Sequence, residues 1–157
     1  HDFLSILAKK SHQYNPFNLL LFDGQALLGF ESRLEQHKHE LMAPGYGHVS
    51  NGGFMSPWPK AIWLENHLKQ LVVSGTSIDS DFLDLLLNET KAHDSLLPQT
   101  GVSLDRERAL SSPFIRLSDY GTRASSLVKI SAHEIVLKER TFGPLGLELQ
   151  TEHRIQR

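Results

Sequence analysis

The stretch Phe17-Asn-Leu-Leu-Leu-Phe-Asp-Gly-Gln-Ala-Leu-Leu-Gly-Phe30 predicts an antiparallel β-hairpin. Its two apolar runs are separated by Asp23-Gly24. This pair favours a tight turn, because glycine accepts the positive φ angle that such a turn needs. We therefore expect the first part of the chain to be built around this pair of strands.

The segments around the hairpin predict helices and irregular connections. Upstream, one helical face carries Phe3, Leu4, Leu7 and Ala8, and Pro16 disfavours helix in the residue before it. Downstream, Pro59 suits a helix start and Gly75 a helix end, with apolar residues at helical spacing between them. The other expected segments are a solvated connection at 31–40, a short strand within 45–53, a helix from Asp79 capped by Ser77 or Asp79, and a loop at 91–112.

The last third of the chain predicts strands. Val128 with Ile130, and Ile135 with Leu137, have the period of two that is typical of a half-buried strand. Helices and strands are segregated along the chain, which indicates an α+β layered fold. The 157 residues have the size of one domain, so we expect a single domain over 1–157. The expected strands are residues 113–117, 122–130, 134–142 and 145–151.

Composition and charge exclude several classes of protein. The formal net charge is −2 at pH 7, whereas a nucleic-acid-binding protein usually carries a basic excess, so we expect no nucleic acid partner. The chain has no apolar run of about 18 residues, which a membrane-spanning helix would need. It has no cysteine, which removes disulfides and thiolate metal sites and fits a reducing compartment. We expect a cytoplasmic protein.

Isolated motif fragments predict no catalysis by themselves. Ser126 and Lys129 have the S-x-x-K spacing of serine acyltransferases, but that chemistry needs both residues on one helical face, and this stretch is predicted as a strand. The nine histidines are scattered, and the sequence shows no convergence of three ligands on a metal. We therefore expect no metal or cofactor. Haem stays open as a ligand, because one histidine is enough to bind its iron.

Two stretches combine glycines with polar side chains that suit binding. Residues 46–60 contain Asn51, whose side-chain amide can donate to an oxyanion or a substrate carbonyl. A turn asparagine that tolerates a left-handed conformation explains it equally well. Residues 120–126 contain Arg123, which can hold a carboxylate or phosphate bidentately. A salt bridge on an edge strand is an equally good explanation.

These two stretches resemble the NRDE-motif protein family, whose animal members are named for transport and Golgi organisation. Gly47-His-Val-Ser-Asn51 is similar to the family's G-[LV]-S-N turn, and Ser56-Pro-Trp-Pro-Lys60 to its T-P-W-P-K segment. Tyr120-Gly-Thr-Arg-Ala-Ser-Ser126 resembles its Y-G-T-R-S-S-T strand, and Phe17-Asn-Leu-Leu20 its F-N-L-L hairpin start. The family's Asn-Arg-Asp-Glu motif and Met-Cys start are absent, so we expect this chain to be the later part of such a domain.

The resemblance implies a distant relative of the N-terminal nucleophile hydrolases, with an αββα sandwich of which part is missing from this chain. In such enzymes a cysteine at the mature N-terminus attacks an amide, and its own α-amine serves as the base. The resemblance implies that Asn51 stabilises the oxyanion and that Arg123 orients either the substrate or a carboxylate of the site. We expect this chain alone to be inactive, because it lacks the nucleophile. The residues expected around the substrate are Ser50, Gly52, Trp58, Tyr120 and Thr122.

Three functions stay open at this point. The intact protein is an amide or thioester hydrolase, a haem or acyl-lipid binding and trafficking protein without catalysis, or an interaction module. The expected partners are a small hydrophobic or acyl ligand and the missing N-terminal segment, within one chain or in trans. A homodimer is left open. An interaction module predicts that Asn51 and Arg123 lie far apart in space.

Overall fold

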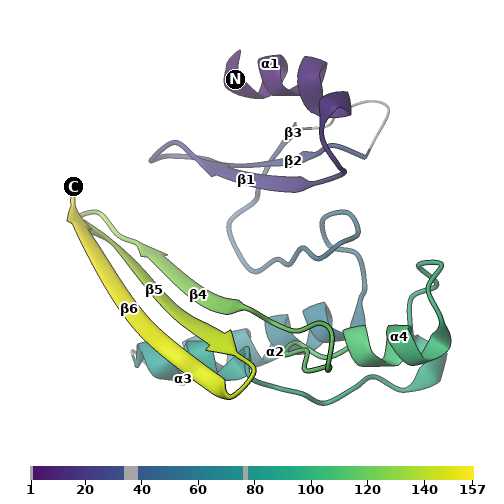
Figure 1. Cartoon of the computed structure of the whole chain (residues 1–157). Helices are drawn as coiled ribbons and strands as arrows, with labels where there is room; N and C mark the ends of the chain where they lie inside the picture. Colours follow the sequence, from purple (N-terminus) through teal and green to yellow (C-terminus); the bar gives the residue numbers. More distant parts are fainter. Residues whose placement is uncertain (1, 34–38, 76–77) are drawn as a thin grey trace. The chain divides into compact units, whose positions relative to one another are not determined.

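The computed structural model describes residues 2–33, 39–75 and 78–157, and the chain forms two compact units, His1–Pro57 (unit 1) and Trp58–Arg157 (unit 2). In the described residues, each unit combines helices with a three-stranded antiparallel sheet (Figure 1). This confirms the expectation of a mixed α and β fold, and the structure adds that its sheets are small and antiparallel. The single domain expected over 1–157 stays a prediction.

Unit 1 contains the predicted helix and hairpin. The helix ends before Pro16 as expected, and the two strands pair with Asn18 opposite Glu31 and Phe22 opposite Leu27. The sheet order is β1-β2-β3. Its elements are α1 (Asp2–Lys10), a 3-10 turn (Ser11–Gln13), β1 (Asn18–Phe22), β2 (Leu27–Glu31) and β3 (His39–Leu41).

The hairpin turn has the predicted chemistry. Gly24 has a φ angle of 100°, which confirms the positive φ expected for this glycine. The Asp23 carboxylate accepts hydrogen bonds from the backbone N–H groups of Gln25, at 2.9 Å, and Ala26, at 2.8 Å. These bonds, the one from Ala26 first, lower the pKa of Asp23 because they favour its charged form.

Two expectations for the region after the hairpin are wrong. The connection expected at 31–40 ends in a strand, since residues 39–41 pair with the open edge of β2; residues 34–38 lie outside the described residues. The strand expected within 45–53 does not form, and Val49 and Phe54 make only an isolated antiparallel bridge. The glycines of this segment explain the difference, because glycine is depleted in strands.

The core of unit 1 lies between α1 and one face of its sheet. Leu4, Leu28 and Phe30 are buried there, and apolar residues of β1 pack around them. Side chains alternate between the faces of a strand, so Leu20 and Leu27 lie on the other face, where both stay substantially exposed. The helix therefore covers one face of the sheet and leaves apolar residues on the other.

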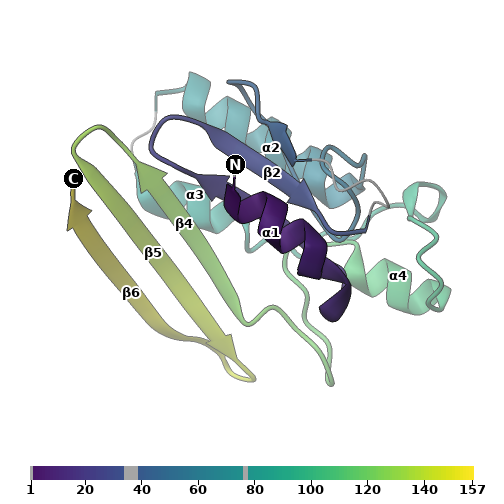
Figure 2. The same cartoon turned by 90° about the horizontal axis from the view of Figure 1, so that it is seen from above.

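Unit 2 places one helix, α3 (Asp79–Leu85), against one face of its sheet, and α2 (Pro59–Val73) packs against α3 (Figures 1 and 2). The strands run in the order β4-β5-β6, and β5 is antiparallel to both neighbours. Its elements are α2 (Pro59–Val73), α3 (Asp79–Leu85), a 3-10 turn (Asp94–Leu96), α4 (Leu104–Leu110), β4 (Ala124–Ile130), β5 (Glu134–Gly143) and β6 (Gly146–Gln156).

The first helix predicted for unit 2 is confirmed, since it begins at Pro59 and ends just before Gly75, which has a φ angle of 74°. The loop expected at 91–112 is wrong because it contains α4, a helix capped by the Ser103 hydroxyl. The cap expected for α3 is also wrong: Asp79 is its first residue and Ile78 precedes it without a side-chain cap. Ser77, the other expected cap, lies outside the described residues.

The structure has three strands at the end of the chain, where the sequence predicts four. Residues 113–117 form no strand, and Arg116 makes only an isolated bridge with Gly121. The last strand is longer than expected and continues to Gln156. Buried side chains explain the first difference: Ser112 and Phe114 are buried, and this segment packs on the end of the sheet instead of adding to its edge.

Ion pairs tie α3 to the sheet of unit 2. The Asp79 carboxylate pairs with Lys129 of β4 and, at 3.0 Å, with Lys138 of β5. The hydrogen bond from Lys129 is the main cause that lowers the pKa of Asp79. The hydroxyl of Ser126 donates instead to Glu139, at 2.7 Å. Ser126 and Lys129 therefore lie on opposite faces of β4, which confirms the strand prediction for this S-x-x-K fragment.

None of the helices in the described part of the chain is both long enough and apolar enough to cross a membrane.

Candidate functional site

The turn that carries Asn51 is a closed loop in unit 1. Val49 and Phe54 form an antiparallel bridge, and the backbone N–H of Met55 donates to the carbonyl of His48 at 3.0 Å. The four residues Ser50 to Gly53 lie between these pairs. Met55 has a φ angle of 58° and, among the described residues, is the only non-glycine residue with a positive φ. Asn51 is therefore not in the left-handed conformation that would explain it as a turn residue.

The side chain of Asn18 holds this turn from β1. Its Nδ2 donates to the carbonyl of Ser50 at 2.8 Å and to that of Gly52 at 2.7 Å. Its Oδ1 is buried and has no hydrogen-bond partner in the part of the chain that the structure describes. One side chain thus binds the backbone on both sides of Asn51, whose own side chain is exposed.

A carboxylate from β2 holds the other end of the turn. Glu31 accepts a hydrogen bond from the backbone N–H of Phe54, and both its carboxylate oxygens lie 2.9 Å from the position of a Cβ at Gly53. Arg33 adds a longer hydrogen bond, from its guanidinium to the carbonyl of Gly52 at 3.4 Å. The backbone of the turn is thus fixed by side chains from both strands of the hairpin.

A mainly apolar cavity of about 400 Å³ lies beside the same loop, entirely within unit 1. Gly29 allows the side chains of Met42 and Phe54, which line the cavity, to pack closely against β2. A Cβ at Gly29 would clash with Met42 and would lie 2.9 Å from the ring of Phe54. The imidazole of His48 also lies at the cavity, and its Nε2 is 3.0 Å from the carbonyl of Ser56. The lining residues are Leu20, Leu27, Met42, Ala43, Gly45, Tyr46, Gly47, His48, Val49, Phe54 and Met55.

The second predicted stretch forms a small hairpin in unit 2. Ile115 and Thr122 exchange backbone and side-chain hydrogen bonds, since Thr122 N–H donates to the Ile115 carbonyl and Ile115 N–H to Thr122 Oγ1, each at 2.9 Å. The N–H of Leu117 donates to the carbonyl of Tyr120 at 2.8 Å and closes the turn. Thr122 is therefore a residue that positions the loop.

The tip of this hairpin is tied to α4. Arg106 pairs with Asp119 at 3.0 Å, and its guanidinium lies 5.3 Å from the centre of the Tyr120 ring. Tyr120 is 51% exposed, so the contact orients the ring without burying it.

A cavity of about 340 Å³ in unit 2 brings together three of the predicted residues, Tyr120, Thr122 and Arg123. Arg123 directly precedes β4, and its carbonyl accepts a hydrogen bond from Phe142 N–H at 2.9 Å. Its guanidinium forms no ion pair within the described ranges, unlike Arg116, which pairs with Glu89 at 3.1 Å. The salt bridge considered for Arg123 is therefore not seen there.

Trp58 directly precedes α2 without a side-chain cap hydrogen bond, and it lines neither of the two cavities described above. The Nζ of Lys60 lies 5.8 Å from the centre of the Trp58 ring and donates to the carbonyl of Leu110 at 2.9 Å. This bond satisfies a carbonyl at the C-terminal end of α4. Burial lowers the pKa of Lys60 because it disfavours the charged amine. Lys60 and Trp58 thus have a structural part in joining α2 to α4.

The predicted site residues divide between the two units. Ser50, Asn51 and Gly52 lie in the clamped turn of unit 1. Tyr120, Thr122 and Arg123 lie at the cavity of unit 2, and Trp58 lies at the start of the same unit. Their catalytic and substrate-binding roles stay predictions. Among the described residues, no group of three histidine, cysteine or carboxylate side chains is placed to hold a metal ion.

Sequence reasoning missed the residues that position the site. Asn18 was recognised only as part of a motif, although a polar residue inside an apolar strand signals a buried hydrogen-bonding role. Glu31 follows its strand directly but has no motif around it. Glu148 lines the cavity beside Arg123 because β6 is irregular at that point, and a register shift leaves no signal in the sequence.

In the described residues, fold and site define a mixed α and β protein with a ligand-sized cavity in each unit, and comparisons with known proteins add its family. The family model for Transport and Golgi organisation 2 matches residues 1–144. The Transport and Golgi organization protein 2 homolog of Bos taurus is 30% identical over an alignment of 158 positions, gaps included, and this alignment covers 90% of the present chain and 57% of that relative. The chain belongs to the Transport and Golgi organisation 2 family, which confirms the resemblance, and it spans a little over half the length of its bovine relative.

Proposed function

We propose that the complete protein is an amide or thioester hydrolase of the N-terminal nucleophile type, built as an αββα sandwich. The face of each sheet that its helices leave open supports the sandwich. Leu20 and Leu27 are exposed on this face in unit 1, and Val128 and Leu137 in unit 2. Two-sheet sandwiches bury such faces. We place this function in the cytoplasm, without nucleic acid.

The turn at residues 50–53 carries the proposal for catalysis. Its backbone is held by Asn18 and Glu31, while the side chain of Asn51 faces outward. A donor that is fixed before the reaction stabilises an oxyanion without reorganisation. In this proposal Asn51 is that donor, Arg123 orients the substrate, and the nucleophile is a cysteine outside these 157 residues, which contain none. The neighbours expected around the substrate are Ser50, Gly52, Trp58, Tyr120 and Thr122.

The test uses the complete protein and a panel of fluorogenic acyl amides and thioesters. Replacing the N-terminal cysteine with alanine should abolish turnover. Asn51→Ala should lower kcat by about 10²- to 10³-fold, the usual cost of losing one oxyanion donor. Asn66→Ala, on the exposed side of α2, is the matched control and should leave kcat unchanged. Unchanged turnover in the cysteine variant would remove the hydrolase proposal.

A second candidate function is the binding and trafficking of an acyl lipid or haem without catalysis. The cavity of about 400 Å³ in unit 1 supports it, because its size and mainly apolar lining suit a hydrophobic ligand. Among the described residues that line the cavity, His48 is the one histidine, and its Nε2 is already bonded to Ser56. An acyl chain therefore fits this cavity better than haem does, since haem needs a free axial ligand.

Displacement of a fluorescent fatty acid tests this candidate directly. Leu20→Asp places a charge in the cavity and should abolish binding, whereas Leu145→Asp, at a fully exposed position outside it, should have no effect. A haem titration without a saturable Soret shift would remove the haem version. Fatty-acid binding that Leu20→Asp leaves unchanged would remove the cavity as the site.

A further inference from the structure

We propose that the cavity of unit 2 binds a free amino acid as a zwitterion, with Arg123 holding the carboxylate and Glu148 the ammonium group. The proposed function already uses Arg123 to orient the substrate, and this inference names the class of ligand that Arg123 would bind. It rests on that binding role and does not require catalysis. All the residues that line this cavity belong to unit 2.

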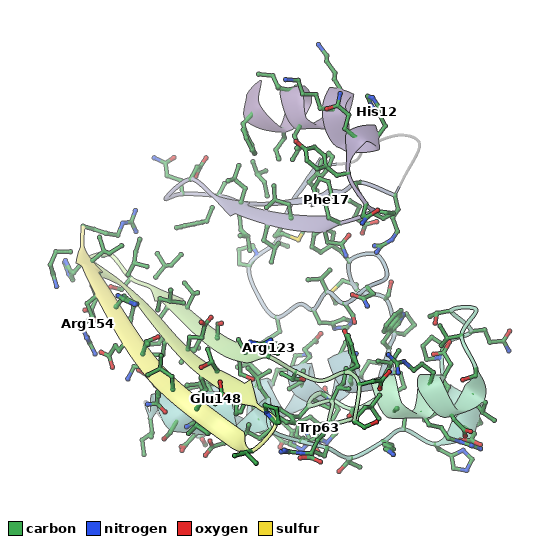
Figure 3. All side chains as sticks on the ribbon, in the orientation of Figure 1. His12, Phe17, Trp63, Arg123, Glu148 and Arg154 are labelled. Carbon is green, nitrogen blue, oxygen red and sulfur yellow. The ribbon has the colours of Figure 1, made fainter. Side chains whose placement is uncertain are left out.

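Strand topology brings the two charged residues to one end of the sheet. β4 and β6 both run antiparallel to β5, so the beginnings of β4 and β6 lie at the same end. Arg123 directly precedes β4, and Glu148 lies near the beginning of β6 (Figure 3). Both residues line the cavity.

A β-bulge aims the carboxylate of Glu148. Thr141 pairs with Leu149 and Phe142 with Leu147, so Glu148 is the extra residue of β6. Bulges re-aim a side chain in this way and are frequent beside functional sites. The Glu148 carboxylate lies directly over Gly143, where any Cβ would clash with it. The glycine thus leaves the space that the carboxylate occupies at the cavity wall.

Of the four charged residues that line the cavity, two form ion pairs with residues outside it, and one positive and one negative side chain have no ion-pair partner among the described residues. Arg116 is paired with Glu89 at 3.1 Å, and Asp119 with Arg106 at 3.0 Å. Arg123 and Glu148 form no ion pair in the part of the chain that the structure describes, with each other or with any other residue. A ligand that carries both charges can pair with both side chains, whereas a simple anion meets the repulsion of Glu148.

The rest of the cavity suits the size and the apolar side chain of an amino acid. The rings of Phe114 and Phe142 meet edge to face, with their centres 4.8 Å apart, and Leu117 and Pro144 add apolar surface. A volume of about 340 Å³ is at the lower end of the range for ligand sites. Phenylalanine is the probe that matches this chemistry.

Isothermal titration of the 157-residue chain with three probes tests the inference. L-phenylalanine should bind, and N-acetyl-L-phenylalanine and phenethylamine, which each lack one charge, should bind about tenfold more weakly or worse. Arg123→Gln should weaken phenylalanine about tenfold. Glu148→Gln should weaken phenylalanine similarly but tighten N-acetyl-L-phenylalanine, because it removes a like charge. Arg157→Gln, outside the cavity, is the control and should change nothing.

The outcomes separate this inference from the proposed function. If N-acetyl-L-phenylalanine binds as tightly as phenylalanine, Glu148 has no role and the zwitterion site is wrong. The far-UV circular dichroism spectrum checks that the chain is folded. If the chain is folded and no probe gives a saturable signal, the inference is also wrong. If phenylalanine binds as expected while the complete protein cleaves no acyl substrate, the hydrolase proposal fails and the amino-acid site stands.

Discussion

The loop at residues 48–55 and the loop at residues 115–122 are both small hairpins that carry predicted site residues, but they are held differently. In the first, side chains from neighbouring strands bind the backbone, with Asn18 and Glu31 as the main contacts. In the second, the backbone pairs mostly with itself, Thr122 adds one bond, and the side-chain contacts from outside the loop include the exposed pair of Arg106 with Asp119. A loop held by side chains depends on single residues far away in sequence, so its geometry is more vulnerable to substitution.

The largest expected effect is that of Asn18→Asp. The substitution keeps the shape but places a carboxylate oxygen against the carbonyls of Ser50 and Gly52 in place of a donor. We expect the free energy of unfolding of unit 1 to fall by about 3 kcal/mol. Hydrogen exchange of the β1 and β2 amides measures it, and Asn66→Asp is the control. Unchanged protection of these strands would show that the clamp is not needed.

Tryptophan fluorescence provides an internal comparison for the same variant. Both tryptophans, Trp58 and Trp63, are in unit 2. If the clamp stabilises its own unit, Asn18→Asp should change amide exchange in unit 1 more than the tryptophan-monitored unfolding of unit 2. Equal loss by both probes would contradict a local effect and indicate a single cooperative structure.

A smaller effect is expected for Gly53→Ala. The added Cβ would lie 2.9 Å from the Glu31 oxygens, so the carboxylate or the turn must move. Gly53 has no positive φ angle, so the cost is steric, about 1–2 kcal/mol of unfolding free energy. Gly47→Ala is the matched control, because its nearest neighbour is the flexible Met55 sulfur at 3.4 Å. Urea denaturation compares the two, and an equal loss would remove Glu31 as the cause.

Thr122→Val should have about the effect of one hydrogen bond. The valine keeps the shape but leaves the N–H of Ile115 without the Thr122 hydroxyl, at a cost of about 1 kcal/mol. Thr90→Val, at an exposed position, is the control. Thermal unfolding followed by tryptophan fluorescence measures both. If Thr122→Val lowered the free energy of unfolding as much as Asn18→Asp does, the proposed difference between the two loops would be wrong.

The smallest expected effect is the pH dependence due to Lys60, which supports the second loop through α4. Burial lowers its pKa in the folded protein, so between that pKa and the unfolded value the unfolded chain binds more protons. The stability due to Lys60 therefore rises as pH rises through this window. The Tm of the wild type relative to Lys60→Met should increase from neutral pH to about 10.4, by no more than a few degrees. A flat difference would contradict the burial of the amine.

Much of the fold could be predicted because its signals are local. Asp23-Gly24 identified the first hairpin, and Pro59 and Gly75 identified the ends of α2, since these residues restrict or permit particular backbone angles. Long alternating segments identified β4 and β5. The helix α4 was missed because its charged residues resemble a loop, and its Ser103 cap is its clearest sequence signal.

The candidate site was predictable in part. The motifs around Asn51 and Arg123 identified the two loops and the family, and the structure brings Tyr120, Thr122 and Arg123 to one cavity. The residues that hold and complete these loops were not predictable in the same way. Asn18 is 32 residues from Ser50, and Glu148 faces the cavity through a shift in strand register.

The sequence by itself determined the family, the class of fold and the positions of most turns, because these depend on nearest neighbours along the chain and on residue types at fixed spacing. Only the tertiary structure decided which polar side chains hold the Asn51 turn, and which charges stay unpaired beside Arg123. Those outcomes depend on the pairing register of strands and on side chains that meet across the fold, and neither is encoded in any short stretch of residues.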